Sequence, residues 1–256
     1  MLFLLDERTA ATTQLRPARS GLVTICAHPP EGAGGPDASG LRVLLVTDLI
    51  VRSAELAGLQ AFTMVTRGSQ PSSNANSGWP TADALGIHPP TATGDSHDSE
   101  TPLDGRADIH VTCQPIDATD GIISHVGHVH TRVIRAVGAT PSEHDPLAVR
   151  LALMCVPHHE PVDLTSEFLT TADQALRHWR AQVAQWAEAP SQPMPKDIAT
   201  EIQASFASIS TVPLLSLLKM VAADPQVPAG ARFETFAYAD RVLGLDLARA
   251  IGQPPS

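Results

Sequence analysis

The sequence has few of the features that mark a secreted or membrane-bound protein. Its 256 residues include three cysteines, too few and odd in number for a disulfide framework, which fits a reducing compartment. No apolar run reaches the roughly 18 residues needed to cross a bilayer. The apolar start at residues 2–5 is too short for a signal peptide and is followed at once by Asp6. We therefore expect a cytoplasmic protein without a membrane segment.

Positive charge is also scarce. The formal net charge is −10, and Lys196 and Lys219 are the two lysines in the chain. Residues 1–144 hold 15 acidic and 9 basic side chains, and residues 145–256 hold 12 and 8. Because nucleic-acid-binding domains carry an excess of basic residues that contact phosphates, neither half of the chain has the composition of a tRNA-binding domain.

The first part of the chain has the pattern of a parallel α/β sheet. Residues 21–27 and 60–67 are apolar and partly β-branched, as buried strands are. Between them, residues 41–57 are apolar on nearly every face, which predicts a helix buried in the core. Strand, buried helix and strand form the first unit of a parallel sheet. Residues 107–113 and 122–130 predict two further strands.

The second part of the chain is predicted to be helical. Asp145 followed by Pro146 is a favourable start for a helix. Further along, apolar residues recur three and four positions apart, as in Leu169, Ala172 and Leu176, which is the spacing of a helix that packs against other helices. Helices are predicted at about residues 145–155, 165–186, 196–207, 213–223 and 229–243.

These patterns define the expected fold class and domains. Residues 68–106 are rich in Gly, Ser and Pro, and we predict a flexible insert with a short helical turn at residues 81–86. The fold class is α/β. A parallel-sheet, nucleotide-binding (HUP/Rossmann-like) domain is expected over residues 1–144, followed by an α-helical bundle domain over residues 145–256.

Several segments occur in the order found in one enzyme family. They include TICAHP, TDLIVRSAELAGLQAFTMV, ADALGIHPP, ADIH, SHVGHVHTRVIRAVG, DPLAVRLALM and ADRVLGLDL. Their collinear order over most of the chain resembles the cysteinyl-tRNA synthetases, which are class I aminoacyl-tRNA synthetases. The related ligase that joins cysteine to an amino sugar in mycothiol synthesis shares the same features, so the resemblance leaves both relatives open.

The resemblance implies a site that has lost part of its ATP chemistry. In the family, two histidines of a HIGH motif and two lysines of a KMSKS loop stabilise the phosphates of ATP. The HIGH position matches a segment that begins with Asp37, whose carboxylate would repel a triphosphate. Arg132 and Arg135 stand at the two lysine positions and keep a charge that can bind an anion. His125 matches an active-site histidine. We therefore take Arg132, Arg135, His125 and Asp37 as candidate ligand-binding residues, and none as catalytic.

The resemblance also raises the question of zinc. The family binds zinc through Cys, Cys, His and Glu ligands from distant segments, and Cys26 matches the first of them. The segment with the second ligand is missing, and the run at residues 157–160 that resembles the His and Glu ligands lies between two predicted helices. Cys113 and His110 could join Cys26, but strand alternation places residues 110 and 113 on opposite faces. His28 is assigned to the loop after the first strand. We therefore expect no zinc.

The function that follows is that of a shortened, degenerate paralogue. The resemblance implies an anticodon-reading part, which has no counterpart after the ADRVLGLDL segment. We expect a pseudoenzyme that cannot aminoacylate tRNA and that acts by binding a protein partner or an adenylate-like small molecule. The alternative is an ATP-dependent ligase that activates a cysteine-like amino acid without tRNA, through Arg132, Arg135 and His125. We expect no cofactor, with ATP or an adenylate as the alternative left open.

Overall fold

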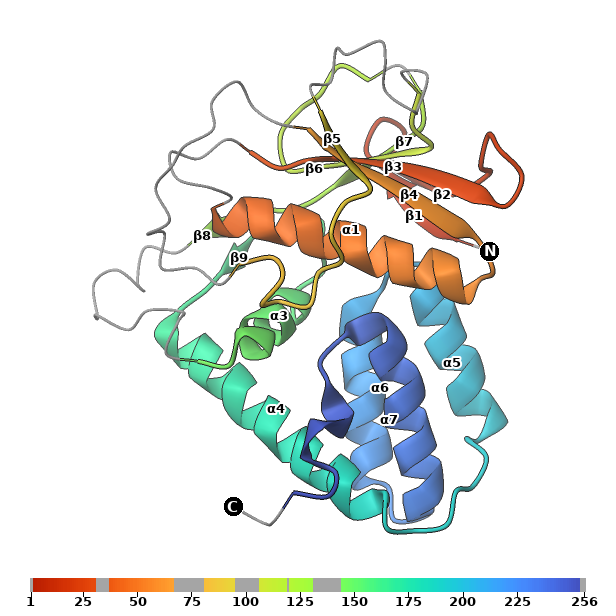
Figure 1. The fold of residues 1–256 in the computed structure, drawn as a ribbon, viewed down its shortest axis with the longest axis vertical. Coiled ribbons are helices and arrows are strands. Elements are labelled where there is room, and N and C mark those ends of the chain that lie inside the picture. Colours follow the sequence, from red (N-terminus) through yellow and green to blue (C-terminus); the bar gives the residue numbers. More distant parts are fainter. Residues whose placement is uncertain are drawn as a thin grey trace.

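A five-stranded parallel sheet forms the centre of the first part of the chain (Figure 1). The computed structural model describes residues 2–30, 37–66, 81–94, 106–118, 120–130 and 144–253. The strand order is β5-β4-β3-β6-β7, and every neighbouring pair is parallel. The α/β fold class predicted from the sequence is confirmed. The strands are β3 (Leu22–His28), β4 (Gln60–Thr66), β5 (Ala92–Gly94), β6 (Ile109–Thr112) and β7 (Ile122–His125).

Helix α1 (Ala38–Leu56) packs against one face of this sheet (Figure 1). Val23, Ile25 and Ala27 of β3 are fully buried, as the residues that face a covering helix must be. The helix is buried on nearly all sides, as its continuous apolar sequence predicts. It begins at Asp37, whose side chain accepts a hydrogen bond from the Gly40 amide at 2.8 Å.

Two small pairs of strands flank the central sheet. An antiparallel hairpin of β1 (Phe3–Asp6) and β2 (Ala11–Gln14) adjoins β7, since the Glu7 amide donates to the Ile123 carbonyl at 2.9 Å. Strand β8 (Val129–His130) pairs in parallel with β9 (Val162–Asp163). The prediction of a single strand over residues 122–130 is therefore wrong. The chain leaves the central sheet after β7 and forms a separate two-stranded sheet with β9 at β8.

Part of the predicted insert over residues 68–106 is folded onto the sheet. Within residues 81–94, Leu85 is 0% exposed and β5 pairs with β4. The sequence predicts no strand there, because the three residues of β5 follow Pro89 and Pro90 and are too few to show a periodic pattern. Residues 67–80 and 95–105 lie outside the described residues, so their flexibility stays a prediction.

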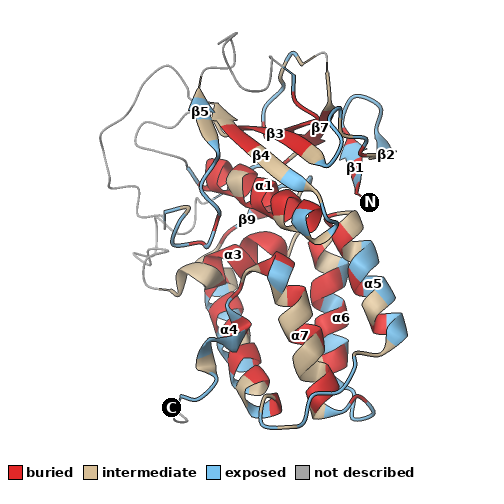
Figure 2. Ribbon diagram, turned by 45° about the vertical axis from the view of Figure 1, so that its right-hand side comes forward, coloured by how far each residue is buried: buried red, intermediate tan, exposed pale blue. Residues whose placement is uncertain are grey.

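The second part of the chain is helical, and its helices agree closely with those predicted. They pack beneath α1, on the side away from the sheet (Figure 1). One hydrophobic core runs from the sheet through α1 into this bundle (Figure 2). The two predicted domains, which meet at residue 144, therefore share a single core. No helix in the described ranges is long and apolar enough to cross a membrane. The helices are α3 (Pro146–Met154), α4 (Ser166–Trp186), α5 (Lys196–Ala207), α6 (Thr211–Ala223), α7 (Ala229–Leu243) and the 3-10 helix η2 (Leu247–Ala250).

Candidate ligand site at the sheet edge

The strand order places a topological switch point between β3 and β6. From β3 the chain adds β4 and β5 on one side, and then returns to add β6 and β7 on the other. In open parallel sheets, ligands bind beyond the carboxyl ends of the strands at such a point. His28 ends β3 and Thr112 ends β6, and the two residues are in register. The crevice beyond these two residues is therefore the first place to look for a site.

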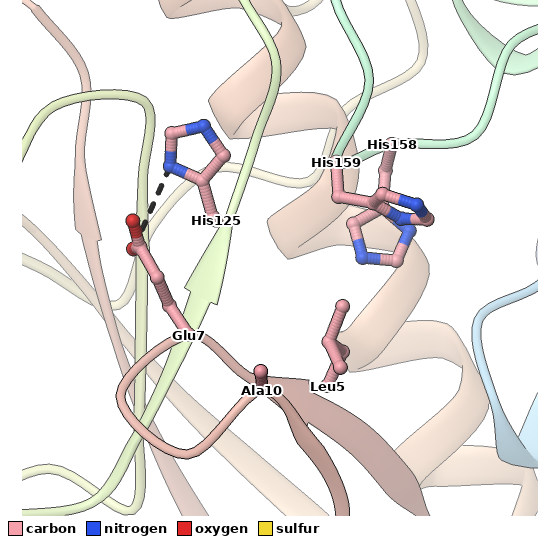
Figure 3. Close-up of a pocket in the computed structure, with 6 residues that line it drawn as sticks. All are labelled: Leu5, Glu7, Ala10, His125, His158 and His159. Carbon is pink, nitrogen blue, oxygen red and sulfur yellow. Dashed lines mark ion pairs between the residues drawn. The ribbon is translucent and has the colours of Figure 1, made fainter.

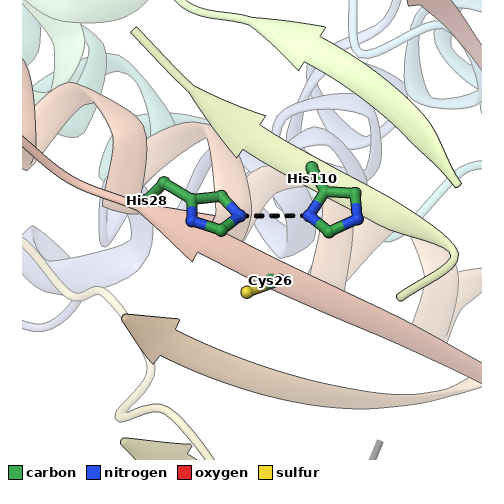
Figure 4. A group of neighbouring side chains, drawn as sticks. All are labelled: Cys26, His28 and His110. Atoms are coloured by element: carbon green, nitrogen blue, oxygen red, sulfur yellow. Dashed lines mark hydrogen bonds between the residues drawn. The ribbon is translucent and has the colours of Figure 1, made fainter. Parts of the chain in front are cut away.

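Three side chains with metal-ligating atoms converge just behind this edge (Figure 4). Cys26 and His28 are two residues apart on β3 and share a face, and His110 of β6 lies in register with Cys26. This face is opposite to the one that α1 covers. His28 Nε2 lies 3.0 Å from His110 Nδ1, and one ligating atom from each of the three residues lies within 4.8 Å of the others.

The register that creates this cluster is fixed by a buried carboxylate. Asp108 immediately precedes β6, and its Oδ2 accepts hydrogen bonds from the amide and the hydroxyl of Thr24, both at 2.8 Å. Its Oδ1 accepts from the Ala18 amide at 2.8 Å. These bonds join β6 to β3 from residues that are 84 positions apart. A slip of one residue would turn His110 to the other face of the sheet.

Two further polar groups face the outer nitrogens of the histidine rings. Asp120 Oδ1 lies 3.4 Å from His110 Nε2, while Asp120 Oδ2 accepts from the Ala107 amide at 2.9 Å. His110 Nε2 makes no hydrogen bond to any described residue. The Thr66 hydroxyl lies 3.4 Å from His28 Nδ1. The inner nitrogens of the two rings thus face each other, and the outer ones face oxygen atoms.

Burial sets the protonation of the cluster. It lowers the pKa of His28 to about 4, with His110 adding to the effect. It also lowers the pKa of His110, against the opposing charge of Asp120. Burial and Asp120 raise the pKa of the Cys26 thiol to about 12. At neutral pH the rings are uncharged, which leaves imidazole lone pairs free to act as ligands.

A second group of histidines lines a cavity of about 220 Å³ (Figure 3). His125 comes from the end of β7, and its Nδ1 lies 3.6 Å from the Glu7 carboxylate of the β1–β2 turn. His158 and His159 come from the loop between α3 and β9. Burial, with smaller effects from neighbouring groups that include His159, lowers the pKa of His158 to about 4. The cavity thus places one carboxylate and three imidazoles around the same space.

The structure places the predicted site residues in different surroundings. Cys26 lies in the cluster with His28 and His110, whereas His125 lines the histidine cavity. Asp37 caps α1, so its carboxylate occupies the helix N-terminus, where an anionic ligand would otherwise be favoured. The proposed ligand contacts of Arg132 and Arg135 fall in the range 131–143, which lies outside the described residues.

Sequence reasoning missed His28, as well as Asp120, Thr66 and Glu7 around the two histidine groups. The sequence predicts a loop at His28, but β3 extends through it. The signal was the Cys-x-His spacing at the end of an apolar strand, which places both side chains on one face whenever the strand reaches the histidine. Cys26 corresponds to one of the zinc ligands that the resemblance implies, whereas His28 and His110 correspond to none of them.

Comparisons with known proteins found no matching protein-family model and no matching curated protein.

Proposed function

We propose that this chain is a cysteinyl-tRNA synthetase-like protein that does not charge tRNA and that binds a small, adenylate-like ligand at the carboxyl edge of its central sheet. The observation that carries the proposal is the switch point between β3 and β6, where parallel sheets of this topology bind nucleotides and related ligands. The collinear segments that resemble the synthetase family support the same class of ligand. A protein partner is the other occupant that this proposal admits.

Asp37 favours a ligand with little negative charge. Its carboxylate accepts from the Gly40 amide and stands at the start of α1, directly beyond the edge of the sheet. Two unit charges of the same sign 4 Å apart repel by about 4 kcal/mol at the dielectric typical near a protein surface. A triphosphate carries several such charges, the phosphate monoester of AMP carries about 1.5–2 at neutral pH, and the phosphate of an aminoacyl adenylate carries one. We therefore propose AMP-like or adenylate-like ligands over ATP.

Titration calorimetry with AMP, ATP and a non-hydrolysable cysteinyl-adenylate analogue tests this proposal. The adenylate analogue should bind most tightly, and Asp37→Asn should improve the affinity for ATP more than that for AMP. The double variant Arg132→Ala, Arg135→Ala should weaken all three. Its matched control replaces two exposed arginines, Arg177→Ala and Arg249→Ala, with the same change in net charge. Absence of nucleotide binding to the wild type would remove the small-ligand proposal and leave a protein partner.

The alternative function is an ATP-dependent ligase that activates a cysteine-like amino acid without tRNA. The Glu7 carboxylate, 3.6 Å from His125 Nδ1 in the histidine cavity, favours it, because an imidazole beside a carboxylate can act as a general acid–base group. Cysteine-dependent exchange of pyrophosphate into ATP, lost in His125→Ala, would establish this ligase. Transfer of cysteine to tRNA above background would overturn both functions.

A further inference from the structure

The cluster of Cys26, His28 and His110 brings together three metal-ligating atoms, which the packing of the sheet does not require. The hydrogen bond between the two rings engages one nitrogen of each ring. The Cys26 sulfur is the third ligating atom of the group, and Cys26 is 3% exposed. We propose that these three side chains bind one zinc-class transition-metal ion and leave one coordination position open. This inference replaces the expectation of no zinc that the sequence suggested. It goes beyond the proposed function and does not depend on nucleotide binding.

The distances fit an ion after a small adjustment. Zinc binds nitrogen at about 2.0–2.1 Å and thiolate sulfur at about 2.3 Å in a tetrahedral arrangement, which holds two nitrogen ligands about 3.3 Å apart. The facing nitrogens of His28 and His110 are 3.0 Å apart. Three bonds would form if the rings separated by a few tenths of an ångström and the Cys26 side chain rotated toward them. The ring proton of the His28–His110 hydrogen bond would move to an outer nitrogen, and the Cys26 thiol proton would be released to solvent. The backbone register need not change.

The surroundings of the rings are those of metal-binding histidines. A ligating histidine usually donates its other ring N–H to a carboxylate, a carbonyl or a water molecule, which fixes the tautomer. Asp120 stands 3.4 Å from the outer nitrogen of His110 and is itself held by the Ala107 amide. Thr66 stands 3.4 Å from the outer nitrogen of His28. Asp120 is thus a positioning residue for the proposed site.

The donor set selects the class of metal. One thiolate and two imidazoles suit zinc and its neighbours in the transition series, whereas magnesium and calcium prefer oxygen ligands. Three protein ligands leave the fourth position for water or for a small ligand. That position should face the carboxyl edge of the sheet, because His28 is half-exposed there while Cys26 and His110 are buried.

Cobalt(II) titration of the full-length, chelator-treated protein tests the site directly. We expect one ion per chain, a near-ultraviolet charge-transfer band from a cobalt–thiolate bond, and displacement by one equivalent of zinc. Cys26→Ser should abolish the band, whereas Cys113→Ser and Cys155→Ser, which remove the cysteines outside the cluster, should keep it. Asp120→Asn should weaken binding by about 10–100-fold, and His110→Asn should weaken it further.

The control readouts separate loss of the site from loss of the fold. Circular dichroism should show the same helix content for each variant without metal, and His28→Gln provides a second ligand variant if His110→Asn does not fold. Zinc should raise the melting temperature of the wild type and not that of Cys26→Ser. His159→Gln, at an exposed histidine, should leave binding unchanged. Absence of stoichiometric cobalt binding, or a charge-transfer band that survives in Cys26→Ser, would overturn the proposal while leaving the nucleotide proposal intact.

Discussion

Two groups of buried polar side chains in this protein differ in how fully their hydrogen bonds are used. Between α1 and the helical bundle, Asp48 accepts from Arg150 at 2.6 Å and from Arg52 at 2.8 Å, and the Asp48 and Arg150 side chains are fully buried. On the opposite face of the sheet lies the cluster of Cys26, His28 and His110. There, one hydrogen bond joins two rings, and the thiol stands beside it.

The first group is explained by the architecture alone. Arg150 also donates to the Leu243 carbonyl at 2.6 Å and to the Leu85 carbonyl at 3.0 Å. The second oxygen of Asp48 accepts from the amide and the ring of His88. These bonds tie α1, α3, the end of α7 and residues 81–94 together. Since all three guanidinium nitrogens and both carboxylate oxygens are paired, this group needs no ligand to account for it.

The largest expected effect comes from breaking this paired group. Asp48→Ala should destabilise the protein by about 3–5 kcal/mol, because it leaves the guanidinium of Arg150 buried without its counter-ion. Urea unfolding monitored by circular dichroism measures the change. A cost below about 1 kcal/mol would contradict the view that this network holds the bundle to the sheet.

The same carboxylate predicts an acid limb of the stability curve. Burial opposes the ionisation of Asp48, but Arg150 and Arg52 outweigh it and hold its pKa below the ordinary value. The native state therefore binds the proton less readily than the unfolded state. This contribution to stability is present above about pH 4 and is lost as the pH falls below it. Asp48→Ala should lack that part of the acid limb.

Arg42 provides the second test. Its buried guanidinium donates to the carbonyls of Gly127, Val156, Pro157 and Glu160 at 2.5–3.1 Å and so holds the loops beside the histidine cavity. Arg42→Met keeps the apolar stem but leaves these acceptors unpaired, and should cost about 2–4 kcal/mol in urea unfolding. Arg42→Lys should be intermediate, because one ammonium cannot serve four carbonyls. A neutral Arg42→Met would refute the structural role.

Much of the fold was predictable because it rests on local patterns. The recurring apolar positions of α4 locate that helix from the sequence alone. The favourable start at Asp145 and Pro146 locates the beginning of α3 in the same way. The short strands β5, β8 and β9 have two or three residues each. Their pairing is decided by distant partners, so no local pattern could identify them.

The candidate site was predictable only in part, for a related reason. Cys26 could be singled out from the sequence, and alternation along the strand correctly kept Cys113 away from it. The contact of His28 with His110 depends on the relative register of β3 and β6. That register is fixed by the bonds of Asp108 to Thr24, which a pattern within one strand cannot show.

The histidine cavity gives a pH-dependent prediction. The pKa of His158 is lowered to about 4, first by burial and then by the charges of His159, Arg42 and His125, while the Ile209 carbonyl acts in the opposite direction. The unfolded chain binds this proton near pH 6.5, so stability is lost as the pH falls from about 6.5 to 4. Between pH 7 and 4.5, the wild type should lose about 2–3 kcal/mol more than His158→Gln. Equal losses in urea unfolding would contradict the assignment.

The cluster itself should contribute little to stability in the absence of metal. His28→Gln removes one hydrogen bond between two neutral rings, a change that typically costs about 1 kcal/mol. Urea unfolding of chelator-treated protein measures it. A cost as large as that of Asp48→Ala would show that the cluster is part of the architecture and would remove the contrast between the two buried groups.

The smallest effect should appear where the same kind of ion pair is exposed. Asp145 Oδ2 contacts Arg180 at 2.6 Å and Arg249 at 3.5 Å, and the Arg249 side chain is 58% exposed, against 9% for Arg180. Arg249→Ala should change stability by at most about 0.5 kcal/mol, because water screens the longer contact and Arg180 still neutralises the carboxylate. Arg180→Ala is the matched comparison, since Arg180 also donates to the Leu245 and Asp246 carbonyls, and it should cost several times more. Urea unfolding at low and at 0.5 M salt should show that the small Arg249 effect disappears with screening while the Arg180 effect persists. Equal costs for the two variants would mean that charge pairing alone, rather than burial with complete hydrogen bonding, determines the contribution of arginine in this protein.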